Sequence, residues 1–130
     1  MVESATVKVN DHHLQFEQRE HYVYFRLDGE SSDYLALRRS LQEIAEKSSR
    51  CNCQRIMVEN NILNEVELGD VFRLTNDLPV IGFARFRLAV VNEKFRSQET
   101  NEFANNVAKN RTIQMRAFSS VPAAETWLLS

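Results

Sequence analysis

The chain has 130 residues, of which 43% are hydrophobic and 26% charged, and its formal net charge is −2. This balance predicts one globular domain that buries roughly two-thirds of the surface of its unfolded form. A slightly acidic chain lacks the field that attracts nucleic acid, and no apolar run reaches the ~18 residues of a transmembrane helix. The first residues also lack the basic and apolar order of a signal peptide, which predicts a cytoplasmic protein.

Hydrophobic periodicity predicts strands and helices that alternate along the chain. The predicted elements, in order, are strands 14–18 and 21–28, a helix to about 47, strand 55–59, a helix from Leu68 to Thr75, strand 83–92, a helix through 103–108, strand 112–118 and a helix at 121–128. Residues 1–10 form either a loose end or a short extra strand. This order predicts an α/β fold with a mixed, mainly parallel sheet of about five strands, an opening antiparallel hairpin and four crossover or terminal helices.

Local signals set the ends of several elements. The two residues at 19–20 separate the first strands and predict a tight antiparallel turn. Ser31 or Ser32 would cap the first helix, because a hydroxyl oxygen accepts a bond from a free backbone N–H. Asn64 and Glu67, three residues apart, resemble a capping box at the start of the second helix.

An apolar connector at residues 78–83 follows the second helix. Pro79 would end that helix and bias Leu78 towards extended backbone. The connector either packs inward or, if exposed, contacts a partner, a membrane surface or an apolar ligand. The sequence leaves open which of these holds, and also whether the chain forms a homodimer.

The sequence shows no grouping of residues that predicts catalysis or a metal site. Cys51 and Cys53 are too few for a zinc site, and a bridge between them would be strained, so we expect two reduced thiols and leave a redox role open. His12 and His13 point to opposite faces of a strand and, with His21, are interpreted as ordinary surface or hairpin histidines. The glycines form no phosphate-binding motif, and no nucleophile motif is present. The prediction is a protein that is not an enzyme and has no cofactor.

The most specific motifs lie in the C-terminal third. They are Arg87-Leu88-Ala89-Val90-Val91, Phe103-Ala104-Asn105-Asn106-Val107-Ala108, Met115-Arg116-Ala117-Phe118 and Ala124-Glu125-Thr126-Trp127-Leu128. With the order of elements, they resemble the SpoIIAA-like group: STAS regulatory domains, small bacterial single-domain proteins and, more distantly, CRAL-TRIO lipid-binding domains. The resemblance implies one SpoIIAA-like domain over residues 1–130.

The junction between the strand at 55–59 and the next helix contains no hydroxyl residue. The chain has no serine or threonine between Ser49 and Thr75. Phosphoregulated STAS members carry a serine or threonine at this junction, so the resemblance implies that this chain is not phosphorylated there. The polar residues that stand there instead, and that we predict to contact a protein partner, are Asn60, Asn61, Asn64 and Glu65.

Two functions follow as hypotheses. The preferred one is a regulatory or interaction domain that binds a protein partner through this strand-to-helix loop. The alternative is the binding or sensing of a small apolar ligand, or of a membrane surface, at a pocket near the second helix. The residues predicted for that pocket are Leu68, Phe72, Ile81 and Phe83.

Overall fold

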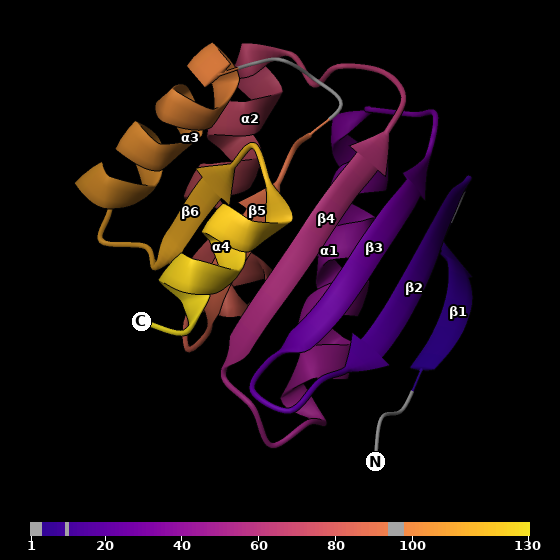
Figure 1. Cartoon of the computed structure of the whole chain (residues 1–130). Helices are drawn as coiled ribbons and strands as arrows, with labels where there is room; N and C mark the ends of the chain where they lie inside the picture. Colours follow the sequence, from indigo (N-terminus) through magenta and orange to yellow (C-terminus); the bar gives the residue numbers. More distant parts are fainter. Residues whose placement is uncertain (1–3, 10, 94–97) are drawn as a thin grey trace.

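Within residues 4–9, 11–93 and 98–130, which the computed structural model describes, the chain forms one six-stranded mixed sheet with helices on both faces (Figure 1). The strands are β1 (Ser4–Val9), β2 (His12–Gln18), β3 (Val23–Gly29), β4 (Arg55–Ile62), β5 (Arg87–Val91) and β6 (Met115–Phe118). The helices are α1 (Tyr34–Ser49), α2 (Leu68–Asn76), the π-helix η1 (Pro79–Phe83), α3 (Gln98–Asn110) and α4 (Val121–Leu128). The strands lie in chain order, antiparallel from β1 to β3 and parallel from β3 to β6.

Side-chain alternation along the central strands divides the core into two parts. Phe25 and Val58 belong to a large cluster with buried residues of α1, α2, η1 and α3. Met57 and Ala89 point to the opposite face and pack under Leu128 of α4. Figure 1 shows the same division, with α1 behind the sheet and α4 in front of it. Right-handed crossovers place the connecting helices α1, α2, η1 and α3 on one face, and α4 covers the other.

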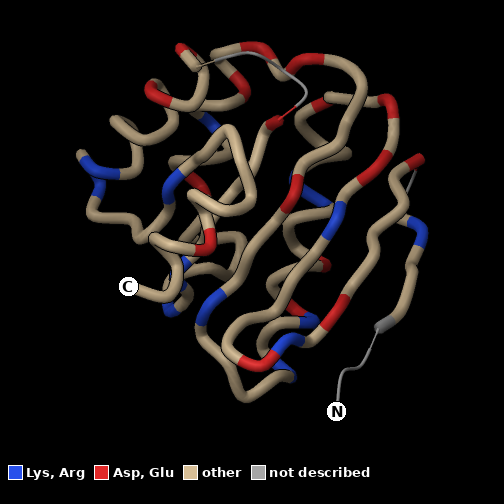
Figure 2. Tube along the Cα trace, in the orientation of Figure 1, with Lys and Arg blue, Asp and Glu red and all other residues tan. Residues whose placement is uncertain are grey.

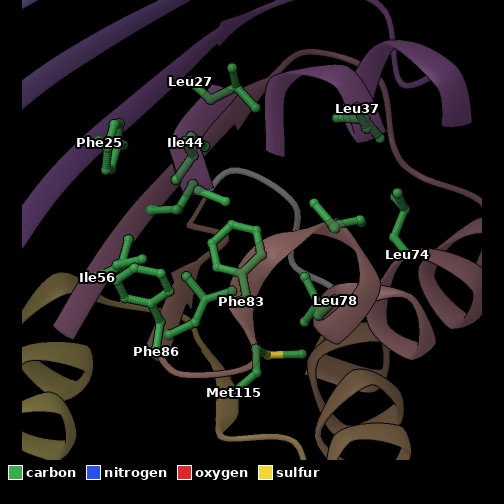
Figure 3. Close-up of a cluster of buried hydrophobic side chains, with 14 of the residues drawn as sticks. Phe25, Leu27, Leu37, Ile44, Ile56, Leu74, Leu78, Phe83, Phe86 and Met115 are labelled. Atoms are coloured by element: carbon green, nitrogen blue, oxygen red, sulfur yellow. The ribbon is translucent and has the colours of Figure 1, made fainter. Parts of the chain in front are cut away.

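The larger cluster is built around apolar side chains of the sheet and the helices that cross it (Figure 3). Phe25 and Ile56 are fully buried on β3 and β4. Phe83 and Phe86 meet edge to face with ring centroids 6.3 Å apart, a favoured geometry for aromatic pairs. These rings close the core beneath η1, at the end of the sheet where β5 begins.

The α/β class, the antiparallel opening and the parallel remainder of the predicted sheet are confirmed. The extra strand within the first ten residues forms as β1, so the sheet has six strands where about five were expected. β4 runs on to Ile62, three residues beyond the predicted end, so Asn60 and Asn61 lie in the strand and not in a loop. The predicted tight turn at 19–20 is wider, because the N–H of Arg19 bonds to the carbonyl oxygen of Tyr22.

The apolar connector is helical, which contradicts the extended backbone predicted before its proline. Leu78 has helical dihedral angles (φ −50°, ψ −44°), and η1 follows it directly. Leu78, Ile81 and Phe83 are buried while Val80 is exposed, so burial of one side of the segment outweighs the local bias. Gly82 has φ 136°, and a Cβ there would lie 3.0 Å from the Cβ of Ala45, which explains the glycine at this turn.

The caps of the first two helices differ from the predicted ones. Asp33, rather than a serine, caps α1 by accepting a bond from the N–H of Ala36 at 3.3 Å. α2 begins without a side-chain cap at Glu67, and Asn64 instead donates to a backbone carbonyl across the loop, so the predicted capping box is wrong. No helix in the described part of the chain is both long and apolar enough to span a membrane.

Candidate functional site

A cavity of about 140 Å³ lies between the sheet and helices α1, α2 and α3. Its walls are mainly apolar and come from the strands and from all three helices. They include Leu27, Val58 and Leu88 of the sheet, with Leu37 of α1, Leu74 of α2 and Ala104 of α3. Figure 3 shows Leu27, Leu37, Leu74 and Leu78 gathered around this part of the core. A cavity with such walls suits an apolar molecule.

One end of the cavity is polar and carries a chain of three asparagine side chains, here called the carboxamide relay. Asn60 donates to Asn92 Oδ1 at 2.9 Å, and Asn92 donates to Asn101 Oδ1 at 2.9 Å. Asn101 is only 5% exposed and donates in turn to Ser119 Oγ at 3.4 Å. Asn60 and Asn92 stand at or just beyond the carboxyl ends of β4 and β5. Ligands of open α/β sheets bind at this end of the strands.

Acidic residues surround the same end of the sheet and form what we call the acidic rim. Its members follow the carboxyl ends of β3, β4 and β5; they are Glu30, Glu65, Glu67, Asp70, Glu93 and Glu99. Figure 2 shows acidic segments along this end of the molecule. Glu65 is exposed and also lines the cavity, so the cavity reaches the surface beside the rim.

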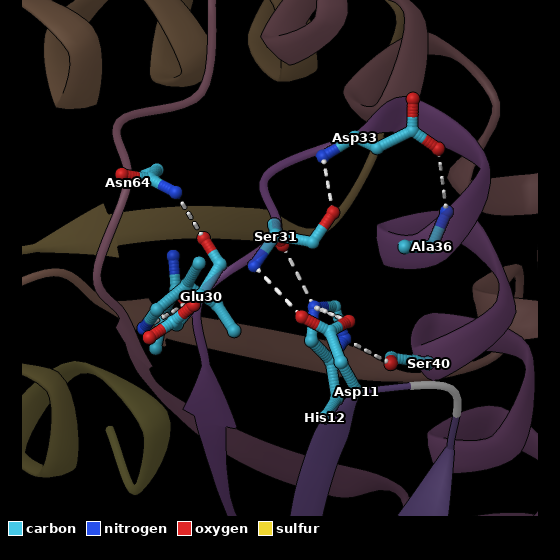
Figure 4. Close-up of polar contacts among 10 residues, drawn as sticks. Asp11, His12, Glu30, Ser31, Asp33, Ala36, Ser40 and Asn64 are labelled. Carbon is cyan, nitrogen blue, oxygen red and sulfur yellow. Dashed lines mark hydrogen bonds and ion pairs between the residues drawn. The ribbon is translucent and has the colours of Figure 1, made fainter.

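The structure separates the four residues predicted to contact a partner. Asn60 and Glu65 line the cavity. Asn61 points away from it and donates to Asp28 Oδ1 on the neighbouring strand. Asn64 donates to the carbonyl oxygen of Glu30 at 2.7 Å and so ties the β4–α2 loop to the loop after β3 (Figure 4).

The four residues predicted to form an apolar pocket do not line this cavity. Leu68 and Phe72 lie on the outer side of α2, 52% and 37% exposed, while Ile81 and Phe83 are packed in the core. The side of α2 that faces the cavity carries Val71, Leu74 and Thr75 instead. The cavity is therefore near the second helix, as expected, but is built from other residues.

Sequence reasoning missed Asn92 and Asn101, although each leaves a signal. Asn101 stands three and seven residues before Ala104 and Ala108, on the buried stripe of α3. A polar residue on an apolar helical stripe needs a buried hydrogen-bond partner. Asn92 is the first residue after β5, next to the end of β4 in the sheet, where it can meet such a partner.

His12 is fully buried, so its interpretation as a surface histidine is wrong. Its Nδ1 lies 2.7 Å from Ser40 Oγ on α1, and its Nε2 lies 2.7 Å from the carbonyl oxygen of Ser31 (Figure 4). Because a carbonyl oxygen only accepts, Nε2 carries a proton, and in the neutral ring Ser40 donates to Nδ1. His13, the next residue, points to the other face and is exposed, as the alternation predicted.

The group around His12 has the residue types of a catalytic triad but not the accessibility of one. Asp11 Oδ1 lies 3.7 Å from the ring Nε2. A serine, a histidine and an aspartate therefore lie next to one another in that order. Ser40 is 0% exposed, so no substrate can reach its hydroxyl. We therefore regard this group as a buried latch, named the His12 latch, that holds β2 and the loop after β3 against α1.

Two further features concern candidate metal ligands and the two cysteine thiols in the described residues. No group of three or more His, Cys, Asp or Glu in this part of the chain is arranged to hold a metal ion. Cys51 and Cys53 are not joined by a disulfide, and both are partly buried. Cys53 donates to the carbonyl oxygen of His21 at 3.3 Å, so its thiol has a structural contact at the base of β3.

Comparison of the sequence with protein-family models gives no match, and comparison with curated proteins gives none. The resemblance to the SpoIIAA-like group therefore stays a prediction. Function is argued below from the cavity, the carboxamide relay and the acidic rim.

Proposed function

We propose that this domain binds a small, mainly apolar ligand in the cavity between the sheet and helices α1, α2 and α3. The observation that carries the proposal is an apolar cavity of about 140 Å³ with one polar end, located at the carboxyl ends of β4 and β5. An apolar cavity of about 150 Å³ in another protein binds benzene. The ligand is therefore the size of a single ring or a chain of about six carbons.

The expected affinity follows from the apolar surface that such a ligand buries. Each buried CH₂ contributes about 0.8 kcal/mol, so six carbons contribute about 5 kcal/mol. Part of this free energy is lost in fixing the ligand's position. The dissociation constant should therefore lie between about 0.2 and a few millimolar, which suits a sensor of an abundant small molecule.

Titration calorimetry with toluene tests this function directly. We expect saturable binding with one site per chain. Val71→Phe should abolish it, because the larger side chain enters the cavity from α2. Val80→Phe is the matched control, since Val80 is 79% exposed on η1 and lies outside the cavity. Equal toluene binding by the two variants, or none by the unmodified protein, would contradict the proposal.

A second candidate function is the binding of a protein partner through the β4–α2 loop, as the sequence hypothesis predicts. The observation in its favour is that Leu63 and Leu68 are 54% and 52% exposed on either side of Asn64 and Glu65. Exposed apolar side chains beside polar ones are typical of contact surfaces. The loop has no hydroxyl residue, so a partner would be controlled by something other than phosphorylation of this loop.

A photo-crosslinking residue in place of Glu65 tests this second function. A specific partner should be captured in a defined stoichiometry, and Leu63→Ala with Leu68→Ala should reduce the capture about tenfold. Leu129→Ala is the control, because Leu129 is exposed directly after α4, the helix on the other face of the sheet. Equal loss of capture with the control variant would count against the candidate.

A further inference from the structure

We infer that the ligand of the cavity carries an uncharged group that both donates and accepts hydrogen bonds, a hydroxyl being the simplest, and that anions are rejected. The inference rests on the proposed function and adds the chemical class of the ligand. Two independent features carry it: the hydrogen bonds of the carboxamide relay, and the charges around the mouth of the cavity.

The relay presents donors and acceptors together. A carboxamide has two N–H donors and two oxygen lone pairs. Asn92 uses one N–H on Asn101 and one lone pair to accept from Asn60. Toward the described residues, its remaining capacity is therefore one donor and one acceptor, and a hydroxyl group can match both. A carboxylate offers only acceptors and an ammonium group only donors, so either would leave relay groups unmatched.

The charges at the mouth act against an anion. Among the described residues that line the cavity there is no lysine, arginine or histidine, and the one charged residue is Glu65. The other five members of the acidic rim follow the same strand ends. A carboxylate entering here would lose water and meet like charge with no cation from the described lining, so its binding is disfavoured.

Four ligands of one ring size test the inference: toluene, phenol, benzoate and benzylamine, each measured by calorimetry against the unmodified protein. We expect toluene and phenol to bind, and benzoate and benzylamine to bind at least about tenfold more weakly than phenol. If neither toluene nor phenol binds, the proposed function itself fails. If they bind and benzoate or benzylamine binds as tightly as phenol, the inference on the head group fails while the proposed function stands.

Asn101→Leu tests the role of the relay. Losing one hydrogen-bonding partner should lower the ratio of phenol affinity to toluene affinity about fivefold. Asn106→Leu is the matched control, because Asn106 is exposed on the same helix and should leave the ratio unchanged. An unchanged ratio in a folded Asn101→Leu protein would overturn the assignment of the relay as the head-group site.

Glu65→Gln provides a second variant that does not disturb the core, since Glu65 is exposed. Removing its charge should raise the ratio of benzoate affinity to phenol affinity about threefold, so that benzoate affinity rises. Benzoate affinity that does not rise would show that the charge of Glu65 is not what excludes anions, and this would overturn the electrostatic half of the inference.

Discussion

The two faces of the sheet are packed differently, and the cavity of the proposed function lies on one of them. Between α4 and the sheet, the small residues Ala89 and Ala124 are fully buried against Met57 and Leu128. The helix and the sheet therefore approach each other closely. On the other face, helices α1, α2 and α3 leave the cavity between them and the sheet. A protein interior is normally packed as densely as an organic crystal. The face that departs from that density holds the cavity, which has Asn60, Asn92 and Asn101 at one end.

The largest predicted effect concerns the His12 latch, which belongs to the cavity face. His12→Ala would leave the buried hydroxyl of Ser40 and the carbonyl of Ser31 without their partner and would open a void. We expect the free energy of unfolding to fall by about 3 kcal/mol. His13→Ala, on the exposed side of the same strand, should change it by less than about 0.5 kcal/mol. Equal effects in urea denaturation would show that the latch does not anchor α1.

A pair of alanine substitutions compares the two faces directly. Ala89→Leu should destabilise the protein by about 2 kcal/mol, because the α4 face has no room for three more carbons. Ala104→Leu places the same carbons into the cavity and should be neutral or stabilise by up to about 1 kcal/mol. Urea denaturation measures both. Similar losses from the two substitutions would mean that the faces do not differ in packing.

The smallest effect is expected at Tyr24, on the face shared with α4. Burial raises the pKa of Tyr24, and a hydrogen bond from its hydroxyl to Glu59 raises it further. A raised pKa means that the neutral phenol stabilises the fold, fully below pH ~10, and that this contribution is lost as the pH rises through the folded-state value. Between pH ~9 and ~11, stability should therefore fall more in the unmodified protein than in Tyr24→Phe, by less than about 1 kcal/mol. Parallel pH profiles would refute this.

The sequence predicted the arrangement that depends on local pattern. The spacing of apolar residues is enough to predict the order of the elements and the parallel sheet. It also predicts the side of α4 on which Ala124 and Leu128 are buried. Ser120, directly before α4, caps it by accepting a hydrogen bond from the N–H of Ala123. The sequence also predicts Ser97 as the cap of the helix through 103–108, and Ser97 lies outside the described residues.

The rest depends on contacts between segments distant in the chain. The burial of His12 requires Ser40 from a helix 28 residues away, and no local pattern indicates that partner. The cavity likewise arises where three helices fail to meet, which the hydrophobic stripe of any one helix cannot reveal. The carboxamide relay joins Asn60, Asn92 and Asn101 from separate segments. The sequence predicted a functional role for Asn60 among these three, and that role was contact with a protein partner.

Methyl NMR during a toluene titration tests the central claim most directly, because it reads both faces in one experiment. Leu74 and Leu88 line the cavity, whereas Met57 and Leu128 belong to the cluster between the sheet and α4. The account predicts saturable shifts at the methyl groups of Leu74 and Leu88, with those of Met57 and Leu128 unchanged. Shifts at Met57 and Leu128, or no saturable shift at any of the four residues, would contradict it.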